Sequence, residues 1–194
     1  MQSEAFYDTI KPMFGGRLTQ PQIDGIEAII NGCNQFGVTD KRMVAYVLAT
    51  PTWETGKTMQ PVSENGKGAS HTYGKMIKQN GQPYTTPNFI YYGRGYTQNT
   101  WYENYQMLSM QPYAKTKGWD FLNHPELLLT VEPSAWATIH CMWHGSYTGV
   151  GLTHYFNDQE TDYVNARKII NGLDQAQTIA GYAQTYFKAL SLPS

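Results

Sequence analysis

The sequence has little charge and no long apolar run. Fourteen Lys and Arg residues stand against fifteen Asp and Glu residues among 194, so the net charge is −1. Strong nucleic-acid binding needs a basic stripe, and we therefore exclude nucleic acid as a partner. No apolar stretch approaches the roughly 20 residues that cross a membrane, and the first six residues lack a basic and then apolar signal peptide. We expect a protein that is made in the cytoplasm and has no membrane span.

Cysteine is also scarce. Cys33 and Cys141 are the only two cysteines, too few for a disulfide framework, which indicates a reducing compartment of synthesis. We interpret both as core thiols, because a buried free cysteine behaves as a small hydrophobe. A chain of 194 residues can bury one sizeable core, so we expect a single domain over residues 1–194 and a monomer.

Aromatic residues, by contrast, make up 14% of the chain, and many lie in residues 91–105, YYGRGYTQNTWYENY. The glycines of this segment, Gly93 and Gly95, let the backbone turn tightly or approach a ligand closely. Its aromatic rings have flat apolar faces with polar tips, and its amides and hydroxyls can bind hydroxyl and acetamido groups. The segment is typical of a sugar-binding surface, although a tyrosine-rich hairpin packed on a core would have the same composition.

Two carboxylates precede this segment. Glu54 ends an apolar stretch, residues 42–48, that we interpret as part of a buried helix, and Glu64 follows in a polar, Gly-rich loop. Cleavage of a glycosidic bond needs one carboxylic acid to protonate the leaving oxygen and one carboxylate to activate water. Two such different environments suit an acid at Glu54 and a base at Glu64.

The identity of the base has alternatives. Glu103, inside the aromatic segment, is a second candidate, and the other interpretation of Glu103 is a solvated surface charge. A third possibility is a water held by Thr100 with little help from a second carboxylate. We choose Glu64.

Together these motifs resemble glycoside hydrolase family 19, which contains class I and II chitinases and the phage endolysins of the lysozyme-like superfamily. Residues 53–55, WET, stand where the family has His-Glu-Thr at the end of a core helix, and residues 91–105 match its Tyr-Tyr-Gly-Arg-Gly…Gln-Leu-Ser/Thr-Trp…Asn-Tyr block. Residues 147–149 and 166–172 also fit. The similarity runs from about residue 40 to 190 and is close to the endolysin branch.

The resemblance implies a mainly α-helical α+β fold of the lysozyme-like type, with a small β-hairpin or sheet beside a helical body and a central substrate cleft. It implies Glu54 as general acid, and Thr100 as the hydroxyl that helps hold the attacking water. Arg167 is either a surface charge or a fixed cation that orients a catalytic carboxylate. We expect no metal and no cofactor. The predicted substrate-binding residues are Tyr92, Arg94, Tyr96, Gln98, Trp101, Asn104 and Arg167.

Three residues depart from the family pattern. Trp53 replaces the usual His beside the acid, and Asn99 stands where Leu is usual. Pro51 falls inside the expected helix, where a proline removes a backbone donor and costs ~3 kcal/mol unless the helix kinks or ends. We therefore predict a kink just before Glu54.

Local signals predict several helices. Thr19 with Gln22 forms a capping-box pattern before a helix that buries Ile23, Ile26, Ile30 and Cys33 and ends at Gly37, and Thr39 or Asp40 caps the next helix. Residues 65–90 predict loops and a small hairpin with a tight turn at Asn80-Gly81. Pro133 predicts the start of a helix through Trp136, Ile139 and Trp143. Asp174 with Gln177 predicts the cap of a last helix that buries Ile179, Tyr182, Tyr186, Phe187 and Leu190.

His140 and His144 are four residues apart on an expected helix, which permits metal binding by geometry. They lack a clear third ligand and the Glu of an HExxH motif, so we interpret them as a packed or solvent-facing pair.

Our hypothesis is an endolysin that cleaves the β-1,4 glycan backbone of peptidoglycan with inversion and acts at the bacterial cell wall, reaching it with the help of a holin. A chitinase and a lytic transglycosylase on the same fold are alternatives. A non-catalytic glycan-binding or virion structural module is a further alternative, favoured by Trp53 and opposed by Glu54, Glu64 and Thr100.

Overall fold

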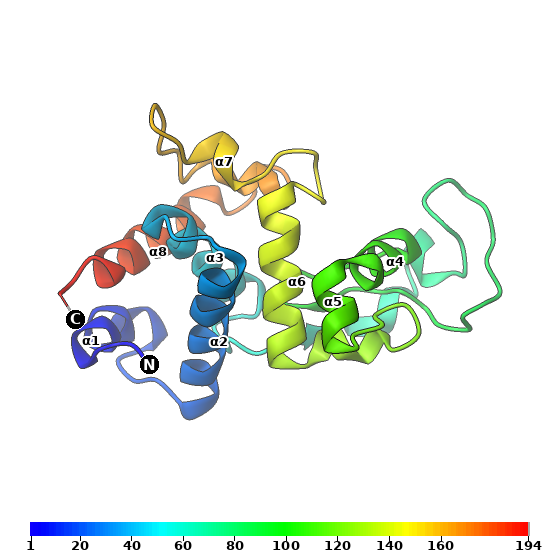
Figure 1. Cartoon of the computed structure of the whole chain (residues 1–194), viewed down its shortest axis with the longest axis horizontal. Coiled ribbons are helices and arrows are strands. Elements are labelled where there is room, and N and C mark those ends of the chain that lie inside the picture. Colours follow the sequence, from blue (N-terminus) through cyan, green and yellow to red (C-terminus); the bar gives the residue numbers. More distant parts are fainter. Residues whose placement is uncertain (194) are drawn as a thin grey trace. The chain divides into compact units, whose positions relative to one another are not determined.

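The computed structural model describes residues 1–193 and is mainly helical (Figure 1). Two short strands, β1 (Val62–Ser63) and β2 (Arg94–Gly95), pair antiparallel, with Val62 opposite Gly95. The predicted mainly helical α+β fold with a small sheet is confirmed. No helix within residues 1–193 is both long and apolar enough to cross a membrane. The helices are α1 (Glu4–Ile10), α2 (Gln20–Phe36), α3 (Lys41–Glu54), α4 (Tyr102–Met110), α5 (Pro112–Lys117), α6 (Val131–His144), α7 (Leu152–Tyr155) and α8 (Ala176–Leu190).

The chain forms two compact units. The first unit comprises residues 1–60 together with the chain from 138 onward, and the second comprises residues 61–137. The first holds α1, α2, α3, α7, α8 and the end of α6, and the second holds both strands, α4, α5 and the start of α6. The single catalytic domain over residues 1–194 stays a prediction.

Helix α3 is the centre of the first unit, and every residue from 43 to 52 in it is buried. It packs most extensively against α8, where the Tyr186 hydroxyl and Thr52 Oγ1 lie 2.9 Å apart. Asp40 caps its start by accepting a hydrogen bond from the Arg42 amide at 2.8 Å, as predicted. The helix continues past Pro51 and ends at Glu54, so the donor that proline lacks falls in the last turn, and the kink there stays a prediction.

Other helix boundaries lie at or near the capping residues that the sequence predicts. Thr19 and Gln22 form the predicted capping box of α2, and Gly37 ends that helix in the left-handed conformation at φ 86°. Ile26, Ile30 and Cys33 are buried as expected, whereas Ile23 is only half-buried. Helix α6 begins at Val131, two residues before the predicted Pro133.

The predicted cap of α8 by Asp174 with Gln177 is wrong, although the helix begins near Asp174 as predicted. The helix begins at Ala176 after Gln175, which adopts a left-handed φ of 57° and makes no side-chain cap. Ile179 and Tyr186 are buried as expected, Tyr182 and Leu190 are only half-buried, and Phe187 is 37% exposed. Four alanines make up the rest of the buried face of the helix. Those alanines are Ala176, Ala180, Ala183 and Ala189.

In the second unit, residues 65–90 form turns and one small hairpin, as predicted (Figure 1). Ile77 and Pro83 pair as an isolated antiparallel bridge around the turn. Gly81 has φ 82°, and the Gln82 amide donates to Asn80 Oδ1 at 3.0 Å, so the Asn80-Gly81 turn is confirmed.

Candidate active site

Glu54 is the last residue of α3, and its carboxylate pairs with a buried arginine. Arg167 Nη1 donates to Glu54 Oε1 at 2.6 Å, with side-chain exposures of 5% for Arg167 and 19% for Glu54. Arg167 lies in a 3-10 turn, Asn165–Ile169, and its Nε also donates to the carbonyl of Asp174 at 3.0 Å. Of the two interpretations of Arg167, the surface charge is wrong and the contact with a carboxylate is confirmed. The side chain of Glu54 therefore meets a cation, and not only the apolar surroundings expected at the end of a buried helix.

Glu64 follows β1 directly and is held by neutral donors. Its Oε2 accepts a hydrogen bond from the Gly93 amide at 2.8 Å, and its own amide donates to the Gly93 carbonyl at 2.8 Å. Its Oε1 accepts from the Tyr73 hydroxyl at 2.9 Å. The side chain of Glu64 is 19% exposed. All of these contacts lie within the second unit.

Gly93 lies very close to two side chains. A Cβ there would lie 2.7 Å from Gln98 Oε1 and 3.2 Å from Glu64 Oε2. Gln98 in turn donates through Nε2 to the carbonyls of Val62 and Gly95, which ties β1 to β2. The close neighbours of Gly93 are thus side chains of this chain, and its predicted close approach to a ligand stays a prediction. The amide donor of Gln98 is occupied by these carbonyls, and the contact of Gln98 with sugar stays a prediction.

Two residues predicted to bind substrate are buried instead. Tyr96 has no exposed surface, and its amide N–H donates to Ser134 Oγ at 2.9 Å. Arg94 is 6% exposed, and its Nη1 donates to the Ile90 carbonyl and the Tyr105 hydroxyl, both at 3.1 Å. Both predictions of sugar contact are therefore wrong. These side chains pack and bond the inside of the aromatic segment.

The other predicted residues of this segment are half-buried. The ring of Tyr92 lies against the Arg94 guanidinium, 3.5 Å from its Cζ. Asn104 Nδ2 donates to the carbonyl of Thr100 at 2.8 Å, one turn earlier at the start of α4. Trp101 precedes α4 with a left-handed φ of 72°. The substrate contacts of Tyr92, Trp101 and Asn104, and the water contact of Thr100, stay predictions.

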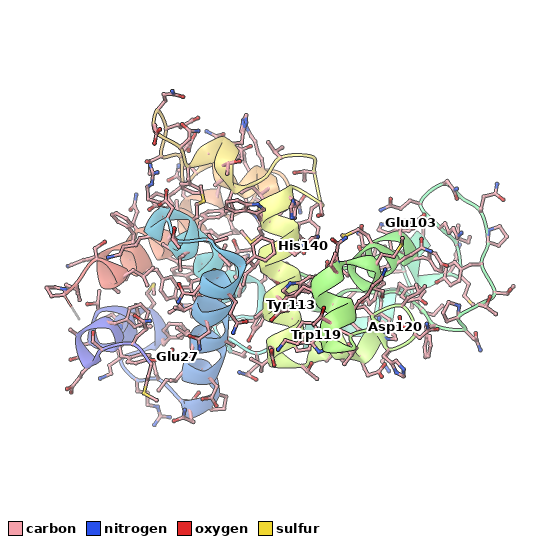
Figure 2. All side chains as sticks on the ribbon, in the orientation of Figure 1. Glu27, Glu103, Tyr113, Trp119, Asp120 and His140 are labelled. Atoms are coloured by element: carbon pink, nitrogen blue, oxygen red, sulfur yellow. The ribbon has the colours of Figure 1, made fainter. Side chains whose placement is uncertain are left out.

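Glu103 does not fit either interpretation made from the sequence. It lies on α4 (labelled in Figure 2), and its Oε1 accepts a hydrogen bond from the Gln79 amide at 2.9 Å, which holds the 77–83 hairpin. Its Oε2 is buried without a partner within residues 1–193. A carboxylate with one oxygen bound to backbone and the other shielded from solvent is poorly placed to activate water. It is not a solvated surface charge either.

His140 and His144 form a packed pair on α6, with ring centroids 4.6 Å apart (His140 in Figure 2). Burial, and secondarily His144, lowers the pKa of His140 to about 4, so this ring is neutral at neutral pH. In the part of the chain that the structure describes, no three His, Cys, Asp or Glu side chains gather as a group that could hold a metal ion. Cys33 and Cys141 are both buried, as predicted, and burial raises the pKa of Cys141 to about 11.

Comparison with known proteins supports the fold and nothing finer. No family model matches the sequence, and no curated protein matches it. Among solved structures, a bacterial family 19 chitinase has a TM-score of 0.60 at 22% identity, covering 98% of this chain and 95% of that one. Chitinase C from Streptomyces griseus HUT6037 has a TM-score of 0.64 at 22% identity, covering 99% of this chain and 78% of that one, and a Glu-to-Gln variant of chitinase C has 0.61. This chain has the fold of family 19 chitinases.

Within this family 19 fold, sequence analysis missed Tyr73 and His71. The Tyr73 ring stacks on His71 with centroids 4.9 Å apart and 12° between planes, and His71 Nε2 lies 3.8 Å from Glu64 Oε1. The feature of the sequence that could have pointed to these two residues is the pair of rings, His71 and Tyr73, in the Gly-rich loop that begins at Glu64. That signal is weak, because nothing local shows that the loop folds back on the carboxylate.

Proposed function

We propose that this chain is a glycoside hydrolase that cleaves the β-1,4 glycan backbone of peptidoglycan by general acid–base catalysis. The observation that carries the proposal is a pair of partly exposed carboxylates held in different ways in a family 19 chitinase fold. Arg167 holds Glu54, and neutral donors hold Glu64. Acid–base cleavage of a glycosidic bond needs two carboxyl groups with different tasks.

Glu54 is the acid in this proposal. Glu54 takes up a proton from water, passes it to the oxygen of the leaving sugar and returns to the carboxylate that pairs with the Arg167 guanidinium at 2.6 Å. Arg167 also fixes the direction of the side chain, because its own Nε is bound to the Asp174 carbonyl. Arg167 thus acts through Glu54, and its predicted direct contact with sugar is not part of this proposal.

Glu64 is the base. It takes a proton from a water that attacks the anomeric carbon, and Thr100 helps hold that water. Direct attack by water without a covalent intermediate inverts the anomeric configuration. Tyr92, Gln98, Trp101 and Asn104 bind the sugars.

Trp53 adds a sugar contact in this proposal. Trp53 is 36% exposed although it is next to Glu54 on α3, and an exposed indole offers a flat apolar face with one N–H donor. The residue that replaces the family His therefore supplies a stacking surface beside the acid.

The proposed biological role is that of a phage endolysin, which is made in the host cytoplasm, reaches the wall with the help of a holin and acts there. The similarity of residues 147–149 to the endolysin branch supports this role. A chitinase is the second candidate, favoured by the solved structures, which are chitinases that match nearly the whole chain.

The test is mass spectrometry of purified Gram-negative peptidoglycan and of chitin oligomers after digestion. The wild type is compared with Glu54→Gln, which cannot donate the acid proton. The matched control is Glu126→Gln, because the Glu126 side chain is 64% exposed and contacts the exposed ring of His124. We expect reducing-end muropeptides from the wild type and the control, and almost none from Glu54→Gln.

Each other outcome has a distinct meaning. Anhydro-sugar ends would identify a lytic transglycosylase, and products from chitin alone would identify a chitinase. If neither Glu54→Gln nor the wild type releases product but both sediment with the glycan, the protein is a binding or virion structural module and the catalytic proposal is wrong.

A further inference from the structure

We propose that Tyr73 is a positioning residue that orients the carboxylate of Glu64 to take a proton from the attacking water, and that His71 holds Tyr73 in place. This inference rests on the proposed function of Glu64 as the base. Tyr73 touches neither substrate nor the reacting atoms in this scheme. It acts through Glu64.

Two donors fix the carboxylate, one at each oxygen. The Gly93 amide binds Oε2 at 2.8 Å, and the Tyr73 hydroxyl binds Oε1 at 2.9 Å. A carboxylate offers about four lone-pair sites, so two remain for water after both donors have bound. With one donor alone, the carboxyl plane could rotate about its last torsion, which is a broad, soft one in Glu. The Tyr73 bond removes this freedom.

Tyr73 is itself held on two sides. The His71 ring stacks on it, and the Trp101 ring meets it edge to face with centroids 5.7 Å apart and 72° between planes. Trp101 belongs to the aromatic segment that also contains Gly93, so both donors to Glu64 are anchored to the same segment. These two ring contacts restrict the rotation of the Tyr73 side chain.

The loop that carries Tyr73 is locked by backbone contact. A Cβ on Gly74, the next residue, would lie 1.7 Å from the carbonyl oxygen of Gly68, so only glycine fits there. The amide of His71 donates to that Gly68 carbonyl at 2.8 Å, and the amide of Gly74 donates to the His71 carbonyl at 3.1 Å. The direction of the Tyr73 side chain is therefore set by the fold of its loop before any sugar binds.

The Tyr73 hydroxyl remains a donor over the working pH range. Burial, followed by the hydrogen bond to Glu64, raises the pKa of Tyr73 to about 12. His71 faces the same oxygen at 3.8 Å and is 54% exposed, so its ring covers the outer side of the pair.

The experiment removes only the hydroxyl. Tyr73→Phe keeps the ring that stacks on His71, and Tyr84→Phe is the matched control, because its hydroxyl donates to the Phe89 carbonyl at 3.0 Å in the same unit. Two quantities are measured in each protein. They are the hydrogen-exchange rate of the Gly93 amide by NMR, and kcat and KM on the glycan that the wild type cleaves.

We expect Tyr73→Phe to raise the exchange rate of the Gly93 amide, because a carboxylate with one anchor lost protects that amide less. We expect kcat to fall about tenfold with KM within twofold, since the lost bond is to a charged group and serves the reacting carboxylate. Tyr84→Phe should change neither quantity.

The inference is overturned if the Gly93 exchange rate is unchanged in Tyr73→Phe, or if it rises while kcat stays at the wild-type value. An equal loss of kcat in Tyr84→Phe would also overturn it, because any lost hydroxyl would then suffice. If the wild type cleaves no glycan, the proposed function fails, and the exchange rates alone then decide whether Tyr73 fixes Glu64.

Discussion

The ion pair between Glu54 and Arg167 predicts a measurable coupling between these two side chains in the free energy of unfolding. The perturbation is a double-mutant cycle that combines Glu54→Gln, which keeps the shape of the side chain, with Arg167→Met, which keeps much of its apolar stem. Each single variant leaves one member of the pair without its charged partner. The double variant removes both charges.

The size of the coupling follows from the burial of the two side chains. Exposed ion pairs contribute ~0–1 kcal/mol, and breaking a fully buried pair costs about 3–5 kcal/mol because a buried charge is left behind. Arg167 is 5% exposed and Glu54 is 19% exposed, so this pair falls between the two limits. We expect a coupling free energy of about 2 kcal/mol. The larger single effect should come from Glu54→Gln, because it leaves the more deeply buried cation unpaired.

The assay is urea unfolding of the wild type, both single variants and the double variant at pH 7. The hydrogen bond from Arg167 to the Asp174 carbonyl is lost in both variants that lack Arg167, so its contribution cancels in the cycle. Single effects that add within ~0.5 kcal/mol would refute the reasoning, because the two side chains would then not interact in solution. A change in the slope of the unfolding curves would show that the variants changed the unfolded state instead.

The remaining predictions concern the anomeric configuration of the product, the contact of Trp53 with sugar and the stability of the protein at low pH. One-dimensional NMR of the first product formed from a β-linked glycan should show the α-anomer, and an initial β-anomer would contradict inversion. Trp53→Ala should raise KM about fivefold with little change in kcat, since an aromatic contact is worth ~1 kcal/mol, and an unchanged KM would remove Trp53 from the sugar site. The pKa of His140 is lowered from 6.5 to about 4 in the folded protein, so as the pH falls the unfolded chain takes up a proton at His140 before the folded chain does. The free energy of unfolding should therefore fall as the pH drops from 6.5 to 4. The loss from this group is roughly 3 kcal/mol, and urea titrations of His140→Gln should lack it; parallel curves for both proteins would contradict the assignment.

Features that depend on neighbours in sequence could be predicted. The capping box of α2 uses residues three apart, Thr19 and Gln22, and the Asn80-Gly81 turn uses residues that are adjacent. The cap of α8 could not be predicted in this way. A non-glycine residue, Gln175, adopts a left-handed conformation there, and the carbonyl of the preceding Asp174 is bound by Arg167.

The aromatic segment shows which part of the site was beyond local reasoning. The composition of residues 91–105 indicated aromatic rings that could bind sugar, but it did not indicate which of these rings are buried. Tyr96 is buried where its amide meets Ser134, 38 residues away, and Glu103 is bound to the Gln79 amide, 24 residues away. Long-range contacts of this kind decide whether a side chain is available to a ligand, and no periodicity within the segment encodes them.

The same long-range contacts distinguish the tasks of the two proposed catalytic carboxylates. Glu54 meets Arg167 across 113 residues of sequence, and Glu64 meets Gly93 across 29. An acid acquires negative charge when it gives up its proton, and a cation beside it stabilises that product state. A base loses its charge when it accepts a proton, so it gains nothing from a cation at that moment and needs only orientation, which neutral donors provide. For Glu54 to be the acid it must hold a proton when the glycan binds, and the guanidinium then stabilises the carboxylate that remains once the proton has left. The assignment of acid and base in this direction stays a proposal.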